Sequence, residues 1–107
     1  MGSTELLPRT EKQTTTEKAK LYQIILLDDD EHSYAYVIEM MMTLFGFSYE
    51  DGHRIAYDVD FLGQATVKIC PLEEAMVGRE QIINYGPDER LPKSRSSMMA
   101  IVQAADQ

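Results

Sequence analysis

The feature that most constrains this 107-residue sequence is an apolar run that ends in four consecutive acids. The run Leu21–Leu27 is rich in Ile, Leu and Tyr, which is typical of a β-strand. The acidic segment Asp28–Glu31 follows it directly. Carboxylates this close together repel one another and are costly to bury without partners. The strand must therefore end at an open part of the fold, where the acids contact water, a cation or hydrogen-bond donors.

Length and composition indicate one small domain. The sequence is 44% hydrophobic and 26% charged, as in ordinary globular proteins. No apolar stretch reaches the roughly 20 residues of a membrane-spanning helix, and the N-terminus lacks the pattern of a secretory signal. The single cysteine, Cys70, cannot form an internal disulfide, and no Cys/His spacing typical of zinc sites is present. We therefore expect a soluble, cytoplasmic protein that needs no cofactor and does not associate with membranes.

The net charge of −8 restricts the kind of partner. Residues 1–20 contain four basic and three acidic side chains, so the net charge of the remaining residues is −9. A domain this acidic is repelled by phosphate backbones, which argues against binding to nucleic acid. Basic or amine-bearing partners are favoured instead.

Two regions differ in composition. Residues 1–19 are polar, rich in Thr, Lys and Glu, and nearly without core-forming side chains, so we expect a flexible tail there. Residues 20–107 carry the apolar patterns of one folded domain. Ser33 and Ser48 each precede an amphipathic stretch and are predicted to cap a helix.

The apolar periodicity predicts six elements. In chain order they are a strand at 21–27, helices at 34–45 and 48–63, a strand at 64–70, a helix at 71–85 and a strand at 97–103. This β-α-α-β-α-β order predicts an α+β fold in which a small three-stranded antiparallel sheet packs against three helices.

The acidic segment Asp28–Glu31 has three interpretations. It can bind a divalent cation, because carboxylate oxygens suit Mg²⁺ and Ca²⁺, or it can be a solvated turn. The string Ile25–Glu31 is also similar to the first strand and acidic pair of a receiver domain, which would imply a Mg²⁺-binding phosphoacceptor in signalling. A receiver, however, alternates five strands with helices and carries a late Lys before a Pro, whereas here Pro92 precedes Lys93.

The predicted helix at 48–63 carries a polar stripe formed by His53, Tyr57 and Asp60. Their spacing places them on one face of the helix. This face either points to solvent or forms a second wall of the site that the acidic segment opens. The sequence contains no pattern of a nucleophile with its base, so an enzyme is not expected.

From Tyr22 to about Ala104 the sequence resembles ClpS, the adaptor family of bacterial ATP-dependent Clp proteases. The resemblance lies in the segments Tyr22–Asp30, Tyr36–Glu39 and Asp58–Ala65. In the family these look like a strand ending in Asn-Asp-Asp, a helix beginning Phe-Val, and the segment Val-His-Tyr-Gln-Gly-Lys-Ala. The resemblance implies an N-degron adaptor, which binds a free N-terminal amine with a bulky hydrophobic first residue. It also implies delivery to a AAA+ unfoldase of the ClpA or ClpC type, with a flexible N-terminal tail needed for delivery.

The resemblance assigns site residues position by position. The implied amine-binding residues are Asp28, Asp29 and Asp60. The implied side-chain pocket residues are His32, Tyr34, Val37 and Ala56. The implied unfoldase-docking residue is Glu73, near the start of the helix predicted at 71–85.

Several of these positions depart from the family pattern. Asp28 stands at the usual Asn, Asp60 at the usual His and His32 at the usual Thr, while Tyr34 and Ala56 each replace a Met. The amine-binding set keeps its acceptors and gains negative charge, and the shape of the pocket changes. The departures leave two alternatives open: an adaptor with altered specificity, or a ClpS-like protein that docks on an unfoldase without reading N-degrons.

Overall fold

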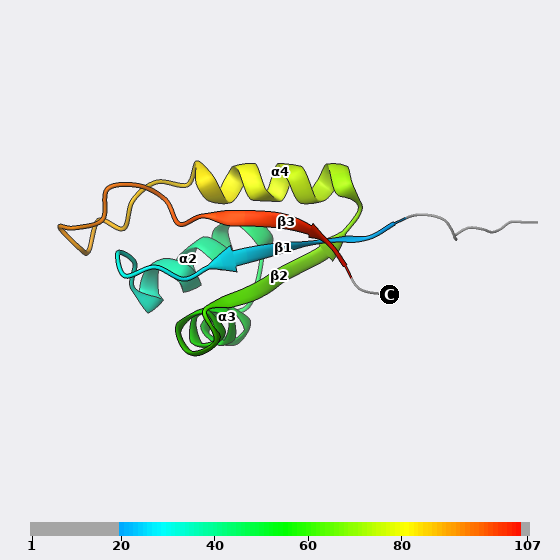
Figure 1. Cartoon of the computed structure of the whole chain (residues 1–107). Helices are drawn as coiled ribbons and strands as arrows, with labels where there is room; N and C mark the ends of the chain where they lie inside the picture. The colour runs from blue at the N-terminus through cyan, green and yellow to red at the C-terminus, as the bar shows by residue number, and fades with distance from the viewer. Residues whose placement is uncertain (1–19, 106–107) are drawn as a thin grey trace, which may run out of the picture.

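The computed structural model describes residues 20–105, which form one β-α-α-β-α-β unit (Figure 1). Its elements are β1 (Tyr22–Leu27), α2 (Tyr34–Phe45), α3 (Tyr49–Leu62), β2 (Gln64–Cys70), α4 (Leu72–Ile83) and β3 (Ala100–Ala104). The predicted α+β fold, with a three-stranded antiparallel sheet and three helices, is confirmed. The tail predicted at residues 1–19 lies outside the described residues. Within residues 20–105, no helix combines the length and the apolar character that a membrane span requires.

The sheet has the strand order β2-β1-β3, with β1 in the centre and antiparallel to both neighbours. Leu26 pairs with Ala65 on one side and with Ala100 on the other, and all three side chains are buried. This face of the sheet belongs to the core that the helices cover. On the opposite face, Ile101 is exposed beside Ile25, as strand alternation requires.

The two predicted serine caps are present at the starts of α2 and α3. The Ser33 hydroxyl accepts a hydrogen bond from the Tyr36 amide at 3.2 Å, and the Ser48 hydroxyl accepts one from the Asp51 amide at 3.1 Å. Each helix ends at a glycine in the left-handed region, which favours glycine because it has no Cβ. In Figure 1, α2 and α3 lie beside the end of the sheet where β1 finishes, and the connection from α4 to β3 extends past that end.

Helix α4 packs against the sheet through Gly78. A Cβ added there would lie 2.5 Å from Cδ1 of Ile24, so a larger residue would overlap the core. Two details of the sequence prediction are wrong: α4 ends at Ile83 rather than at residue 85, and β3 begins at Ala100 rather than at residue 97. Leu72 and Met76 have the apolar character of a core face but are exposed, because the buried face of α4 consists of Ala75, Gly78 and Ile82.

Candidate functional site

A small cavity opens where the end of β1, the first turns of α2 and the second half of α3 meet. Its volume is about 60 Å³. Its lining residues are Asp28, Asp29, His32, Ser33, Tyr34, Val37, Ala56, Val59, Asp60 and Met98. The structure therefore brings together all seven residues that the resemblance assigns to amine binding and to the side-chain pocket. Their roles in binding remain predictions, while Ser33, Val59 and Met98 complete the wall.

The three carboxylates at this cavity have different surroundings. Asp29 accepts a hydrogen bond from the Glu31 amide at 2.9 Å, and Asp60 accepts one from the Tyr34 hydroxyl at 2.8 Å. The backbone amide of Asp28 donates to the Gly63 carbonyl at 3.0 Å, which holds the strand end against the end of α3. The exposed carboxylate of Asp28 has no hydrogen-bond partner within residues 20–105, so its oxygens remain free to accept bonds from a ligand.

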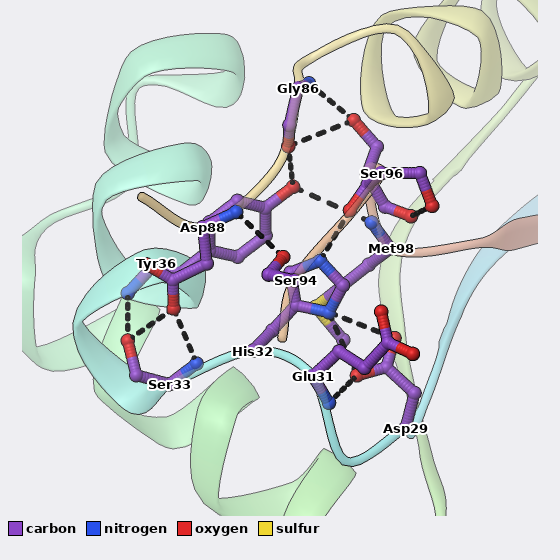
Figure 2. A network of polar contacts seen from close by, with 11 residues as sticks. Asp29, Glu31, His32, Ser33, Tyr36, Gly86, Asp88, Ser94, Ser96 and Met98 are labelled. Atoms are coloured by element: carbon purple, nitrogen blue, oxygen red, sulfur yellow. Dashed lines mark hydrogen bonds and ion pairs between the residues drawn. The ribbon is translucent and has the colours of Figure 1, made fainter. Parts of the chain in front are cut away.

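His32 connects the acidic segment to the connection before β3. Its side chain is only 3% exposed and packs on the ring of Tyr36, with ring centroids 4.5 Å apart. Nδ1 lies 2.7 Å from Oδ1 of Asp29, and Nε2 lies 2.7 Å from the Ser96 carbonyl oxygen. Both partners are acceptors, so the ring can make both hydrogen bonds only as an imidazolium. His32 thus lines the pocket and also orients the Asp29 carboxylate (Figure 2).

Asp88, which the sequence places in a charged loop, is 1% exposed and anchors that loop to the start of α2. The amide and hydroxyl of Ser33 donate to Oδ2 of Asp88 at 2.8 and 2.7 Å, and the Arg90 amide donates to Oδ1 at 3.0 Å (Figure 2). Burial alone would raise the pKa of Asp88, but the bonds from Ser33 and Arg90 outweigh it and lower this pKa to about 2. No periodic pattern in the sequence marks Asp88 as a structural residue.

Tyr36 holds the two ends of the connection between α4 and β3 together. Its hydroxyl donates to the Gly86 carbonyl at 2.6 Å and accepts a bond from the Met98 amide at 3.4 Å. The Ser97 hydroxyl accepts a hydrogen bond from the Gly86 amide. Burial raises the pKa of the Tyr36 hydroxyl. These contacts place the Met98 side chain in the cavity wall (Figure 2).

Tyr34 and Asp60 close the side of the cavity between α2 and α3. The hydrogen bond between them links the two helices at this point. Burial, together with the bond to Asp60 and its charge, raises the pKa of Tyr34 to about 12. Tyr34 therefore carries its proton at neutral pH and acts as the donor.

Two further expectations concern residues outside this cavity. Glu73 lies exposed in the first turn of α4 and does not line the cavity. Of the stripe on α3, Asp60 reaches the cavity, whereas His53 and Tyr57 do not line it. His53 instead packs edge-on against Tyr34, with ring centroids 5.6 Å apart.

The fold and the side chains give no support to the receiver interpretation. The sheet is antiparallel with three strands, whereas a receiver alternates five strands with helices. In the part of the chain from 20 to 105, no group of three or more His, Cys, Asp or Glu side chains is arranged to hold a metal ion. The arrangement instead presents carboxylate oxygens at the mouth of a cavity whose deeper walls are apolar.

Comparison with known families matches residues 17–92 to the family described as "ATP-dependent Clp protease adaptor protein ClpS". The chain belongs to the ClpS family. The resemblance seen in the sequence is thereby confirmed. The description of the family is that of an adaptor protein of the ATP-dependent Clp protease.

Relatives and a solved structure agree with this family. The adapter protein ClpS of Nautilia profundicola is 39% identical over 62 residues, which cover 58% of this chain and 64% of that protein, just under two thirds of its length. The adapter protein ClpS 2 of Agrobacterium fabrum is 25% identical over 88 residues, or 82% of this chain and 85% of the relative. The structure of Agrobacterium tumefaciens ClpS2 bound to L-phenylalaninamide superposes with a TM-score of 0.71 at 22% identity. It covers 82% of this chain and 100% of that one, and it confirms the ClpS fold.

Proposed function

We propose that this ClpS family member is an adaptor that binds the free N-terminal amine and the bulky hydrophobic first side chain of N-degron substrates. In this proposal it delivers them, in the cytoplasm, to a Clp AAA+ unfoldase of the ClpA or ClpC type. The observation that carries the proposal is the meeting of three carboxylates, Asp28, Asp29 and Asp60, at the mouth of a cavity with apolar deeper walls.

The chemistry of the mouth suits an ammonium group. An N-terminal ammonium offers three N–H donors and a positive charge, and carboxylates accept such donors in short, charge-assisted bonds. Asp28 has free acceptor oxygens, Asp29 is held in place by His32, and Asp60 accepts a bond from the Tyr34 hydroxyl through one of its two oxygens. The excess of negative charge also matches the acidity of the whole domain and attracts cationic ligands.

The chemistry of the deeper walls suits an apolar side chain. Val37, Ala56, Val59 and Met98 line the cavity and are each at most 5% exposed. Burial of an apolar side chain against such walls is favourable by about 25 cal/mol for each Å² removed from water. The combination of acceptors at the entrance and apolar walls below supports recognition of the first residue of a chain.

The comparisons support the proposal from a second direction. The curated relatives carry the name of a Clp protease adapter, and the Agrobacterium tumefaciens ClpS2 structure holds L-phenylalaninamide. That small molecule carries a free amine and an aromatic side chain, which are the two groups that the cavity of this chain would recognise.

Delivery is assigned to other parts of the chain. We place unfoldase docking on the exposed side of α4 at Glu73, and we assign engagement of the unfoldase to residues 1–19, which precede the domain at 20–107. Deletion of residues 1–19 should leave peptide affinity unchanged and should stop degradation of a model substrate by the cognate Clp protease.

A peptide screen tests recognition. Peptides that differ only in their first residue are titrated with the free amine and with the amine acetylated. Peptides that begin with Phe, Tyr, Trp or Leu should bind in the micromolar range, and acetylation should abolish binding. Equal affinity for the free and acetylated forms would discard N-degron recognition and would favour a ClpS-like protein that only docks on an unfoldase.

A further inference from the structure

The cavity at the proposed site is smaller than the ligand that it is proposed to bind. Its volume is about 60 Å³, whereas an apolar protein cavity that accommodates benzene has roughly 150 Å³. A Phe, Tyr or Trp side chain therefore cannot enter unless part of the wall moves. The structure indicates which part that is.

Most of the wall is fixed by the core or by hydrogen bonds. The four apolar wall residues of the cavity are buried in the core between the helices and the sheet. His32 is held between Asp29 and the Ser96 carbonyl and packs against the ring of Tyr36. Ser33 is held by Asp88 through two hydrogen bonds. Movement of any of these groups would break packing or several bonds at once.

Of the two rings in this wall, His32 is held at both ring nitrogens, whereas Tyr34 is held by a single hydrogen bond. Tyr34 is half-buried, and this hydrogen bond, from its hydroxyl to Asp60, holds its polar end. Beyond its ring lies a groove of about 550 Å³ between α2 and α3. Residues lining that groove include Ile38, Met42, Tyr49 and His53, and Tyr34 itself lines both the groove and the cavity. The ring therefore separates a small cavity from a large open space whose walls are mostly apolar and aromatic and also include Glu39 and Arg90.

We propose that Tyr34 is a latch that the ligand opens. The ligand's ammonium replaces the Tyr34 hydroxyl at Asp60, and the released ring turns toward the α2–α3 groove, which joins the groove to the cavity and makes room for a bulky first side chain. This inference rests on the proposed function, since the ligand is the N-terminal residue of a peptide. It makes Tyr34 a specificity-determining residue and couples recognition of the amine to recognition of the side chain.

Replacement of the Tyr34 hydroxyl by an ammonium group as the donor to Asp60 is expected to be favourable in free energy. The hydroxyl of Tyr34 is a neutral donor, because its pKa of about 12 keeps it protonated. An ammonium carries a full positive charge, so its bond to the Asp60 carboxylate adds the attraction of opposite charges to a hydrogen bond that the neutral hydroxyl makes without it. The acetylated amine has neither the charge nor the three donors, so an acetylated peptide leaves the latch closed and the cavity small.

The test compares Tyr34→Phe with Tyr22→Phe, which loses the same hydroxyl at the far end of β1, away from the cavity. Each variant and the wild type are titrated with a Phe-first peptide carrying a free amine. Tyr34→Phe should bind about tenfold more tightly than the wild type, because no hydroxyl competes for Asp60, and Tyr22→Phe should match the wild type. Equal affinity of Tyr34→Phe and the wild type would overturn the latch while leaving N-degron binding intact.

A crystal structure of the wild-type protein with L-phenylalaninamide gives a readout that does not depend on any variant. The latch predicts that the Tyr34 hydroxyl lies beyond hydrogen-bond distance of Asp60, with the ligand's amine in its place. A complex in which the 2.8 Å bond persists would overturn the latch. Failure of every free-amine peptide to bind the wild type and both variants would instead refute the proposed function, and the latch with it.

Discussion

Replacing Asp88 with Asn should destabilise the protein and should change how its stability depends on pH. Asp88 is 1% exposed, and its carboxylate accepts bonds from Ser33 and Arg90. Its pKa is lowered from 3.8 to about 2. At 1.36 kcal/mol for each pKa unit, this corresponds to about 2 kcal/mol of stability at neutral pH. The amide of Asn also turns a donor toward groups that are themselves donors, which adds to the loss.

The sign of the pH effect follows from the direction of the pKa shift. A carboxyl group with a lowered folded-state pKa stabilises the fold above its unfolded-state pKa and loses this contribution as pH falls through its folded-state pKa. The stability difference between wild type and Asp88→Asn should therefore be constant above about pH 5, shrink below pH 3.8 and level off near pH 2.

Urea unfolding at a series of pH values measures this difference. Glu89→Gln is the matched control, because Glu89 is the exposed neighbour in the same loop. We expect Asp88→Asn to lower the free energy of unfolding at pH 7 by about 2 kcal/mol and Glu89→Gln to leave it within about 0.5 kcal/mol. If the two variants have the same stability and the same pH profile, the reasoning about Asp88 is refuted.

Two further substitutions test the packing and the site. Gly78→Ala should lower the free energy of unfolding by about 1–2 kcal/mol despite the gain in helix propensity, because the added Cβ overlaps Ile24. Thermal unfolding measures this change, with the exposed substitution Gln81→Ala as the control. A stabilised Gly78→Ala protein would contradict the packing argument. Asp60→Asn should weaken binding of a free-amine peptide by about 1–3 kcal/mol in calorimetry, because it removes a charge from the mouth of the cavity while keeping an acceptor. Unchanged affinity would show that Asp60 does not take part in amine binding.

Much of the fold could be predicted from the sequence because it depends on local patterns. Apolar periodicity located the helices and strands, and Ser33 and Ser48 marked two helix starts. The buried face of α4 was harder to predict: Leu72 and Met76 are apolar yet exposed, and the buried residues are Ala75, Gly78 and Ile82. Gly78 counts locally as a weak helix residue, and only its contact with Ile24 explains why it is there.

The candidate site could likewise be predicted only in part from the sequence. Its residues could be named from the sequence because they lie in segments that match a family pattern. The hydrogen bonds of these residues could not be predicted, because the bonds join positions far apart in the sequence. The separations are 55 residues for Ser33 and Asp88, 64 for His32 and Ser96, and 26 for Tyr34 and Asp60. Neither periodicity nor spacing indicates such pairings, so these contacts follow only from the three-dimensional structure.

The central claim is that the carboxylates at the mouth of the cavity bind an N-terminal ammonium. The most direct measurement is a pair of calorimetric titrations of the wild-type protein at neutral pH with one Phe-first peptide, free or acetylated at its amine. We expect micromolar affinity for the free amine and no detectable binding of the acetylated peptide. Equal binding of the two peptides would contradict the claim.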